Sequence, residues 1–189
     1  PGDDFLVTSG AGVGGHLIPR GSAPYDVAHR PFTLPRDGEV VGRPVSSMLM
    51  LHLGFSAALW DRFLIALNAP VALWRTGETT VVDGAVFPQR TGPHFGDLRL
   101  SMRGRLCGEA DDAFRLAIGQ HLWFPTAGAD SYVGENQVYA KPEVVVDGRY
   151  DMFRYAAQTG VVVRGAELPP SYELRVGGGV TLRDQRVMV

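Results

Sequence analysis

The sequence predicts an all-β protein, an antiparallel up-and-down transmembrane β-barrel in which at least eight strands are visible. Three observations predict this fold: apolar and polar residues alternate with a period of two, the alternating segments are long, and the connections between them are short and long in turn. Successive side chains of a β-strand point to opposite faces, so each segment has one apolar and one polar face. The 24 glycines and 13 prolines fit a chain rich in turns.

The alternation is clearest in residues 97–107, whose even positions are mainly apolar and whose odd positions carry three arginines. Four later segments repeat this contrast, at 114–124, 138–149, 153–164 and 172–183. Three earlier segments show it more weakly, at 16–34, 49–59 and 63–73. Most of the eight segments have about 11–12 residues, whereas the strands of soluble domains usually have about 5–6.

The connections follow a regular order along the chain. The tight ones lie at 60–62, 109–112 and 150–152, and the longer ones at 35–43, 76–95, 126–137 and 165–171. A meander with short turns at one end and long loops at the other is typical of an outer-membrane barrel. Residues 183–186 predict one more tight turn, after which Val187 begins a ninth strand.

We therefore expect two regions, an N-terminal periplasmic segment at 1–15 and a barrel at 16–189. The ninth strand predicts that the barrel is truncated at its C-terminal end, inside a larger barrel of ten or more strands. A closed barrel of eight strands is the alternative, because an even number of strands returns the chain to the side on which it started.

Alternation by itself does not say which face meets water. In a soluble sheet the apolar face is the core, whereas in a membrane barrel it meets lipid and the polar face lines the lumen. Strand length favours the membrane, because a tilted strand crosses a bilayer with about 9–11 residues. Residues 49–73 favour a soluble alternative, a β-sandwich or a lipocalin-like small-molecule-binding module, because both of their faces are nearly apolar.

The membrane interpretation assigns a role to each face of the strands. The expected lipid-facing residues are Leu51, Leu53, Phe55, Phe63, Ile65, Leu67, Leu98, Leu100, Leu116, Ile118, Val161 and Val163. The expected lumen-lining residues are Arg20, Asp26, Arg30, His52, Asp97, Arg99, Arg103, Arg105, Arg115, His121, Lys141, Glu143, Asp147, Arg149, Arg154, Arg164, Glu173 and Arg175. Three tryptophans lie near strand ends, and their parity places them on the polar face: Trp60, Trp74 and Trp123.

The polar faces are strongly cationic. With Arg62 and Arg183 they carry thirteen cations against five acids, although the whole chain has a net charge of −2. A dry lumen does not hold so many uncompensated charges, so we expect either a water-filled lumen or acids brought by further strands. If the lumen is open, its cationic wall predicts a preference for anions.

Other functions find little support in the sequence. Residues 10–15 match the G-x-G-x-x-G pattern of dinucleotide sites, but Pro19 and Gly21 follow where that site needs a helix. The small net charge argues against nucleic acid as a partner, and a single cysteine excludes an internal disulfide. The five histidines lack metal-site spacing and no segment supplies a G-x-S-x-G elbow.

We expect no cofactor, no metal, no catalytic residue and no enzymatic activity. The enzyme alternative is a barrel hydrolase with a site near His94 or His121.

Four runs of residues carry a family resemblance: 25–31, 51–78, 96–100 and 108–135. In these runs the chain resembles the N-terminal outer-membrane β-barrel of OmpA-family proteins of the myxobacterial type. The resemblance implies a place in the outer membrane of a Gram-negative bacterium, contact with outer-membrane lipid, and often a further domain that binds peptidoglycan. The expected function is that of a structural anchor or a porin-like channel in the cell envelope. Many barrels end in an aromatic residue, whereas this chain ends Val187-Met188-Val189, which favours a fragment.

Overall fold

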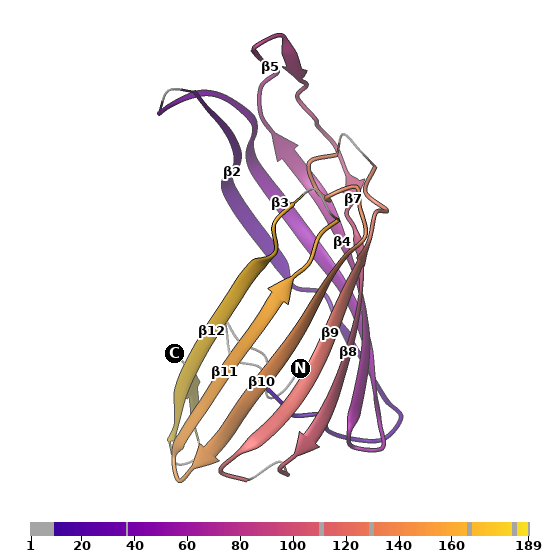
Figure 1. The fold of residues 1–189 in the computed structure, drawn as a ribbon, viewed down its shortest axis with the longest axis vertical. Coiled ribbons are helices and arrows are strands. Elements are labelled where there is room, and N and C mark those ends of the chain that lie inside the picture. Colours follow the sequence, from indigo (N-terminus) through magenta and orange to yellow (C-terminus); the bar gives the residue numbers. More distant parts are fainter. Residues whose placement is uncertain are drawn as a thin grey trace.

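The computed structural model describes residues 10–36, 38–109, 112–128, 131–165, 168–182 and 185–188. Strands, turns and bends make up this part of the chain, with no helix among the residues described (Figure 1). Accordingly, the described residues contain no helix long and apolar enough to cross a membrane.

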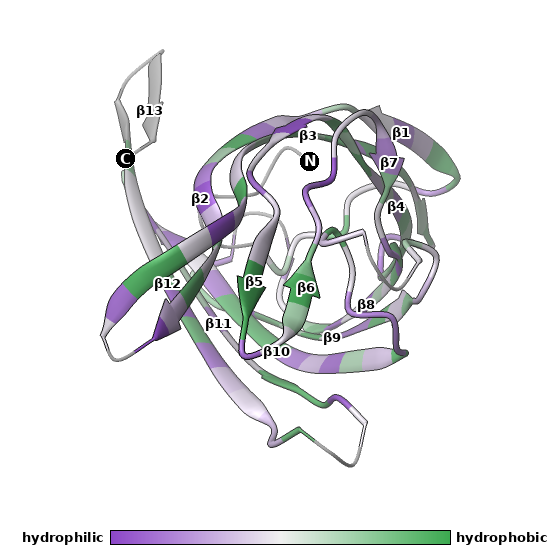
Figure 2. Ribbon diagram, turned by 90° about the horizontal axis from the view of Figure 1, so that it is seen from above, coloured by the Kyte–Doolittle hydropathy of each residue, from purple (hydrophilic) through white to green (hydrophobic). Residues whose placement is uncertain are grey.

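Eleven strands form one antiparallel sheet. Their spatial order is β1-β3-β4-β8-β9-β10-β11-β12-β13, with β2 beside β3 and β7 beside β4, while β5 and β6 form a separate hairpin. The strands are β1 (Ile18–Ser22), β2 (Tyr25–Arg36), β3 (Glu39–Leu59), β4 (Phe63–Thr76), β5 (Thr80–Val82), β6 (Ala85–Phe87), β7 (His94–Phe95), β8 (Leu98–Cys107), β9 (Arg115–Phe124), β10 (Tyr139–Tyr150), β11 (Phe153–Val162), β12 (Ser171–Leu182) and β13 (Gln185–Met188). The sheet curls into a half-barrel (Figure 2). The predicted all-β antiparallel meander is thus confirmed as an incomplete up-and-down barrel, and β13 lies where the sequence predicts a ninth strand.

The alternating segment at 16–34 corresponds to two strands, β1 and β2. Both pair with β3, β1 along its second half and β2 along its first half, with Ala23 and Pro24 between them. The expected long loop at 35–43 is wrong, because β2 continues to Arg36 and β3 begins at Glu39. The pairing of β2 with β3 changes register three times between His29 and Pro35, where the prolines of this region lie. Prolines lack an N–H donor and are tolerated at such irregular or edge positions, so turn-type residues here do not end the strand.

A bulge in β4 corrects the expected orientation of Trp74. Leu49 pairs with Trp74 and Met50 pairs with Ala72, so Leu73 is an extra residue on β4. An extra residue shifts the side-chain alternation by one position. Trp74 is consequently exposed and Arg75 is buried, whereas unbroken alternation places Trp74 on the polar face.

The two ends of the half-barrel differ in their connections (Figure 1). Short turns join β3 to β4, β8 to β9 and β10 to β11 at one end. The longer segments 77–97, 125–138 and 163–170 lie at the other, and the first of these carries the β5–β6 hairpin. Trp60, Asp61 and Asp151 take left-handed backbone angles in the short turns. The predicted order of short and long connections is therefore present except at 35–43.

The N-terminal segment at residues 10–15 lies against the inner face of the curled sheet. Ala11 packs with Ala117 of β9 and Val145 of β10 in a fully buried cluster. Arg103 donates a 2.7 Å hydrogen bond to the carbonyl oxygen of Gly10. Gly15 is fixed to the β3–β4 turn by a 2.8 Å hydrogen bond from its N–H to Asp61 Oδ1. The glycine-rich run is therefore an extended segment on the concave face.

The backbone between β8 and β9 packs closely against Gly148 of β10. A β-carbon on Gly148 would overlap the carbonyl oxygen of Ala113, which accepts a 2.7 Å hydrogen bond from the Tyr155 hydroxyl. We predict that Gly148→Ala lowers the free energy of unfolding by on the order of 1–3 kcal/mol, the usual effect of overpacking. The measurement is urea unfolding in detergent micelles, followed by tryptophan fluorescence.

Gly178→Ala in β12 is the matched control. A β-carbon there lies 3.8 Å from the carbonyl oxygen of Arg154, an ordinary contact. Its unfolding midpoint is expected to stay near that of the parent chain. Equal midpoints for the two alanine variants would contradict the tight packing around Gly148.

Candidate functional site

Charged side chains are buried on the concave face and apolar side chains are exposed on the convex face. The concave face is the one against which residues 10–14 lie. On it, Lys141 is 7% exposed, Glu143 4% and Asp147 1%. On the opposite face Phe55 is 58% exposed and Ile118 49%. Charged groups are almost never fully buried unless they are paired, and each of these three has an oppositely charged partner on the same face.

The twelve predicted lipid-facing residues divide into two groups. Those exposed are Leu53, Phe55, Phe63, Ile65, Leu67, Ile118 and Val163. Those half-buried are Leu51, Leu98, Leu100, Leu116 and Val161. None of the twelve is in the buried class, so the described sheet has no compact core built from them.

Glu143 is the centre of a buried charge cluster on the concave face. Its side chain is fully buried, and its Oε1 lies 3.1 Å from Arg103 Nη2. Its Oε2 lies 2.9 Å from His121 Nε2 and 3.3 Å from Lys141 Nζ. The same oxygen accepts a hydrogen bond from Gln158 Nε2. Four side chains from β8, β9, β10 and β11 thus converge on one carboxylate.

Glycines on the neighbouring strands make room for this carboxylate. Gly119 and Gly160 are the register partners of Glu143 on β9 and β11. A β-carbon on Gly119 would lie 2.9 Å from Glu143 Oε1, and one on Gly160 would lie 3.3 Å from the Glu143 β-carbon. A larger side chain at either position would therefore crowd the Glu143 side chain.

A second buried ion pair links β9 to β10. Arg115 and Asp147 are register partners, and the guanidinium donates from Nε to Asp147 Oδ1 at 2.8 Å and from Nη2 to Oδ2. Two parallel hydrogen bonds of this kind fix both partners in one geometry. Further along the concave face, Lys141 Nζ also lies 2.8 Å from Glu173 Oε2, and Arg175 contacts the same carboxylate.

Asp97 has a different role from the one expected of a lumen-lining residue. It is buried and accepts hydrogen bonds from the backbone N–H groups of Ala127 at 3.1 Å and Glu135 at 2.8 Å. It therefore anchors the long 125–138 connection on β8. The same connection supplies Glu135, which pairs with Arg164 at 2.8 Å, so part of the compensating acid comes from a loop.

The other predicted lumen residues are exposed or half-buried. Asp26 is exposed and lies 2.6 Å from His52 Nε2. Arg30 and Arg175 are also exposed. Half-buried positions are taken by Arg20, Arg99, Arg105, Arg149, Arg154 and Arg164.

Sequence reasoning missed several residues of the concave face. Gln158 and Ser101 occupy polar-face positions, and side-chain parity was the signal that points to them. Ser101 Oγ lies 2.7 Å from His121 Nδ1. Arg75 is buried and donates to the carbonyl oxygen of Ser131. Because the bulge at Leu73 shifts the side-chain alternation by one position, counting along the sequence assigns Arg75 to the wrong face.

Ser101, His121 and Glu143 are connected in the order of a nucleophilic triad. The carboxylate is at the same time the partner of Arg103 and Lys141. The arrangement therefore holds the imidazole in a fixed position between β8 and β10. The described residues contain no group of three or more His, Cys, Asp or Glu side chains placed to hold a metal ion. The absence of enzymatic activity stays a prediction.

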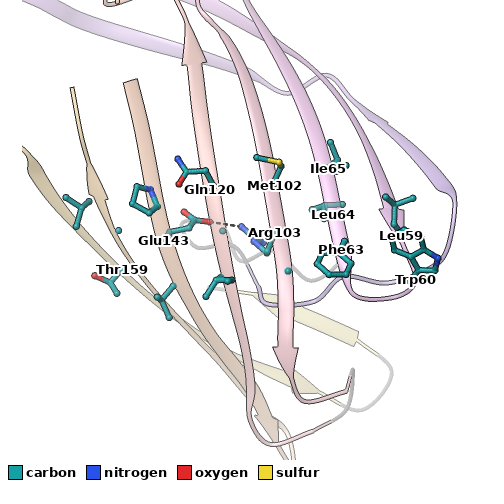
Figure 3. Close-up of a pocket in the computed structure, with 17 residues that line it drawn as sticks. Leu59, Trp60, Phe63, Leu64, Ile65, Met102, Arg103, Gln120, Glu143 and Thr159 are labelled. Atoms are coloured by element: carbon teal, nitrogen blue, oxygen red, sulfur yellow. Dashed lines mark hydrogen bonds and ion pairs between the residues drawn. The ribbon is translucent and has the colours of Figure 1, made fainter. Parts of the chain in front are cut away.

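The convex face carries a wide apolar groove of about 890 Å³. Figure 3 shows its lining residues spread over neighbouring strands, and two of them, Arg103 and Glu143, form an ion pair. Its exposed apolar members include Phe63, Ile65 and Ile118. The groove is therefore part of the exposed apolar surface, and Arg103 and Glu143 of the charge cluster also contribute to its lining.

Comparisons with protein-family models, with curated proteins and with solved structures found no match. The site is consequently interpreted from its own geometry.

Removal of the central charge is expected to destabilise the half-barrel. Glu143→Gln keeps the shape of the side chain but leaves Arg103 and Lys141 without their shared negative partner. Breaking a buried ion pair from one side costs about 3–5 kcal/mol, so we predict a loss of that size in the free energy of unfolding. Urea unfolding measures it.

Glu173→Gln serves as the comparison, because that carboxylate is 31% exposed and water screens its ion pairs. Its expected loss is below about 1 kcal/mol. A loss for Glu143→Gln no larger than that for Glu173→Gln would show that the cluster does not depend on its central carboxylate.

Proposed function

We propose that this chain is a bacterial outer-membrane β-barrel protein of OmpA type, which acts as a structural anchor or as a porin-like channel with an arginine-rich interior. The observation that carries the proposal is the reversed distribution of the two faces, with exposed apolar side chains outside and buried ion pairs inside. Outer-membrane lipid is then the partner of the convex face.

The convex face is difficult to reconcile with water as its only neighbour. Exposed apolar side chains follow one another over β3, β4, β9, β11 and β12, including Phe55, Ile65, Ile118, Phe153 and Leu174. Soluble monomers rarely expose contiguous apolar patches larger than a few hundred Å². Hydrocarbon in contact with the same side chains removes this cost, at about 25 cal/mol for each Å² taken from water.

Strand length and strand pairing support the same proposal. From β3 to β12 the strands of the meander have 10 to 21 residues, and about 9–11 residues span the hydrocarbon layer at a 45° tilt. A backbone inside lipid must satisfy its hydrogen bonds internally, and the antiparallel register from β3 to β12 does this strand by strand.

The channel form of the proposal rests on the charge of the concave face. Its arginines outnumber the acids that pair with them, and a cationic wall raises the local concentration of anions. The resemblance to OmpA-family proteins adds a further domain that binds peptidoglycan as a possible partner of the anchor form. No nucleic acid enters the proposal.

A soluble binding module is the second candidate function. Met50, Ala58 and Ala72 are buried on the concave side of the β3–β4 hairpin, which gives this part of the sheet a small apolar interior. A soluble β-sandwich or lipocalin-like protein has an apolar interior of this kind. It predicts that the chain stays dissolved without detergent.

A charge placed on the convex face separates the two candidates. In a bilayer, Ile118→Arg at mid-strand costs about 2–4 kcal/mol, so we predict that it lowers the fraction of chain inserted into lipid vesicles. Val81→Arg is the control, because Val81 is 62% exposed in the β5–β6 hairpin, away from the main sheet. Flotation with vesicles and protection from added protease measure insertion. Equal behaviour of both variants, with the parent chain dissolved and not bound to vesicles, would favour the soluble module.

The ion preference of the interior is a separate prediction. In planar bilayers with a salt gradient, an open barrel is expected to give a reversal potential on the anion-selective side. Cation selectivity would contradict the cationic lumen. Insertion without conductance would assign the anchor form.

A further inference from the structure

A polar cavity of about 440 Å³ lies on the concave side of β1, β3, β4 and β8. One wall is the N-terminal segment at residues 12–14. The other walls carry Arg20, Arg99, Arg103 and His121, together with the uncharged polar side chains of Ser22, Asn68 and Ser101. The described residues that line it include no aspartate and no glutamate.

Small side chains on the central strands create this hollow. Arg20 on β1 and Ser101 on β8 lie in one row across the sheet, and the residues between them are Ser56 and Ala66. In the next row Gly54 and Asn68 separate Ser22 from Arg99. The cavity therefore has short side chains at its base, and the long side chains of Arg20 and Arg99 lie at its sides.

The cations of the cavity are only partly neutralised. Arg103 shares the Glu143 carboxylate with Lys141, and Arg20 donates 2.8 Å from Nη2 to the carbonyl oxygen of Gly14, a neutral group. The Arg99 guanidinium lies 5.9 Å from the ring centroid of Trp123, and its Nε has no hydrogen-bond partner among the described residues. The cavity therefore has an excess of positive charge beside free volume.

We propose that this cavity binds the oxyanion group of a small water-soluble solute, a phosphate, sulfate or carboxylate held by Arg99 and Arg20. A guanidinium matches the planar spacing of two oxyanion oxygens, and serine and asparagine supply further donors. The charged and polar side chains that line the cavity lie on the concave face, opposite the face proposed to meet lipid, which favours a dissolved solute over a lipid headgroup. The inference names the solute class of the proposed channel and rests on that function for the route by which the solute arrives.

The test is equilibrium binding of inorganic phosphate to the full 189-residue chain in detergent micelles, measured by calorimetry and by the fluorescence of Trp123 against Arg99. The expected result is saturable binding that chloride at equal ionic strength does not displace. Arg99→Gln removes the charge with a side chain of similar reach, and it is expected to weaken binding about tenfold or more. Arg99→Lys keeps the charge but not the planar guanidinium, and its phosphate affinity is expected to lie between those of the parent chain and Arg99→Gln.

Arg62→Gln is the matched control, because Arg62 is exposed in the β3–β4 turn and the substitution changes net charge equally. It is expected to bind phosphate as the parent chain does. No saturable binding, full displacement by chloride, or equal weakening by Arg62→Gln and Arg99→Gln would each overturn the oxyanion site. Circular dichroism of the variants identifies any loss of binding that comes from misfolding, and Arg99→Lys then carries the comparison.

This outcome is distinguishable from failure of the proposed function. A chain that inserts into vesicles but does not bind phosphate refutes the oxyanion site alone. A chain that binds phosphate yet remains dissolved without detergent refutes the membrane function, and the cavity is then the ligand site of a soluble protein.

Discussion

The buried carboxylate of Glu143 is the interaction on which the concave face depends. An isolated charge of this kind is strongly disfavoured in a low-dielectric interior, and it is retained because Arg103, His121 and Lys141 lie within 3.3 Å of its oxygens. The partners come from three consecutive strands of the sheet. The charge cluster therefore links neighbouring strands through their side chains, in addition to the backbone hydrogen bonds between those strands.

The same requirement explains the composition of the surrounding positions. Glycines flank Glu143 on both neighbouring strands, and residues 10–14 cover the concave face with an extended backbone whose carbonyl oxygens accept from Arg103 and Arg20. The larger apolar side chains of the strands mostly occupy the convex face, whereas ion pairs, residues 10–14 and smaller apolar residues such as Ala58 and Ala117 occupy the concave face. The exposed apolar convex face is the observation that underlies the proposed membrane location.

The long connections form a third structural unit at one end of the half-barrel. Asp97 binds the backbone of the 125–138 connection, and Arg75 donates to the carbonyl oxygen of Ser131 in the same connection and to that of Gly92. The loops are thus tied to the strands by buried charged groups from the concave face. The sequence analysis placed Asp97 on the polar face, but it predicted neither its contacts with the loop backbone nor those of Arg75.

The sequence by itself determined the all-β class, the meander, most strand positions and the face on which each side chain lies. It could do so because a period of two is a local property of an extended chain. For the same reason it located Arg103, Lys141 and Glu143 on one face. It failed where the period is broken, at the bulge that turns Trp74 outward and Arg75 inward, and where prolines occur within a strand at 31–35.

Only the tertiary structure decided which charges meet and what fills the concave face. The contact of Glu143 with Arg103 joins residues 40 positions apart, and that of Arg103 with Gly10 joins residues 93 apart. Such contacts depend on strand register and on the curvature of the sheet, which no local pattern contains. Curvature also brings Arg20 and Arg99 to one hollow, so the cationic faces that the sequence reveals become a cavity only after the sheet has curled.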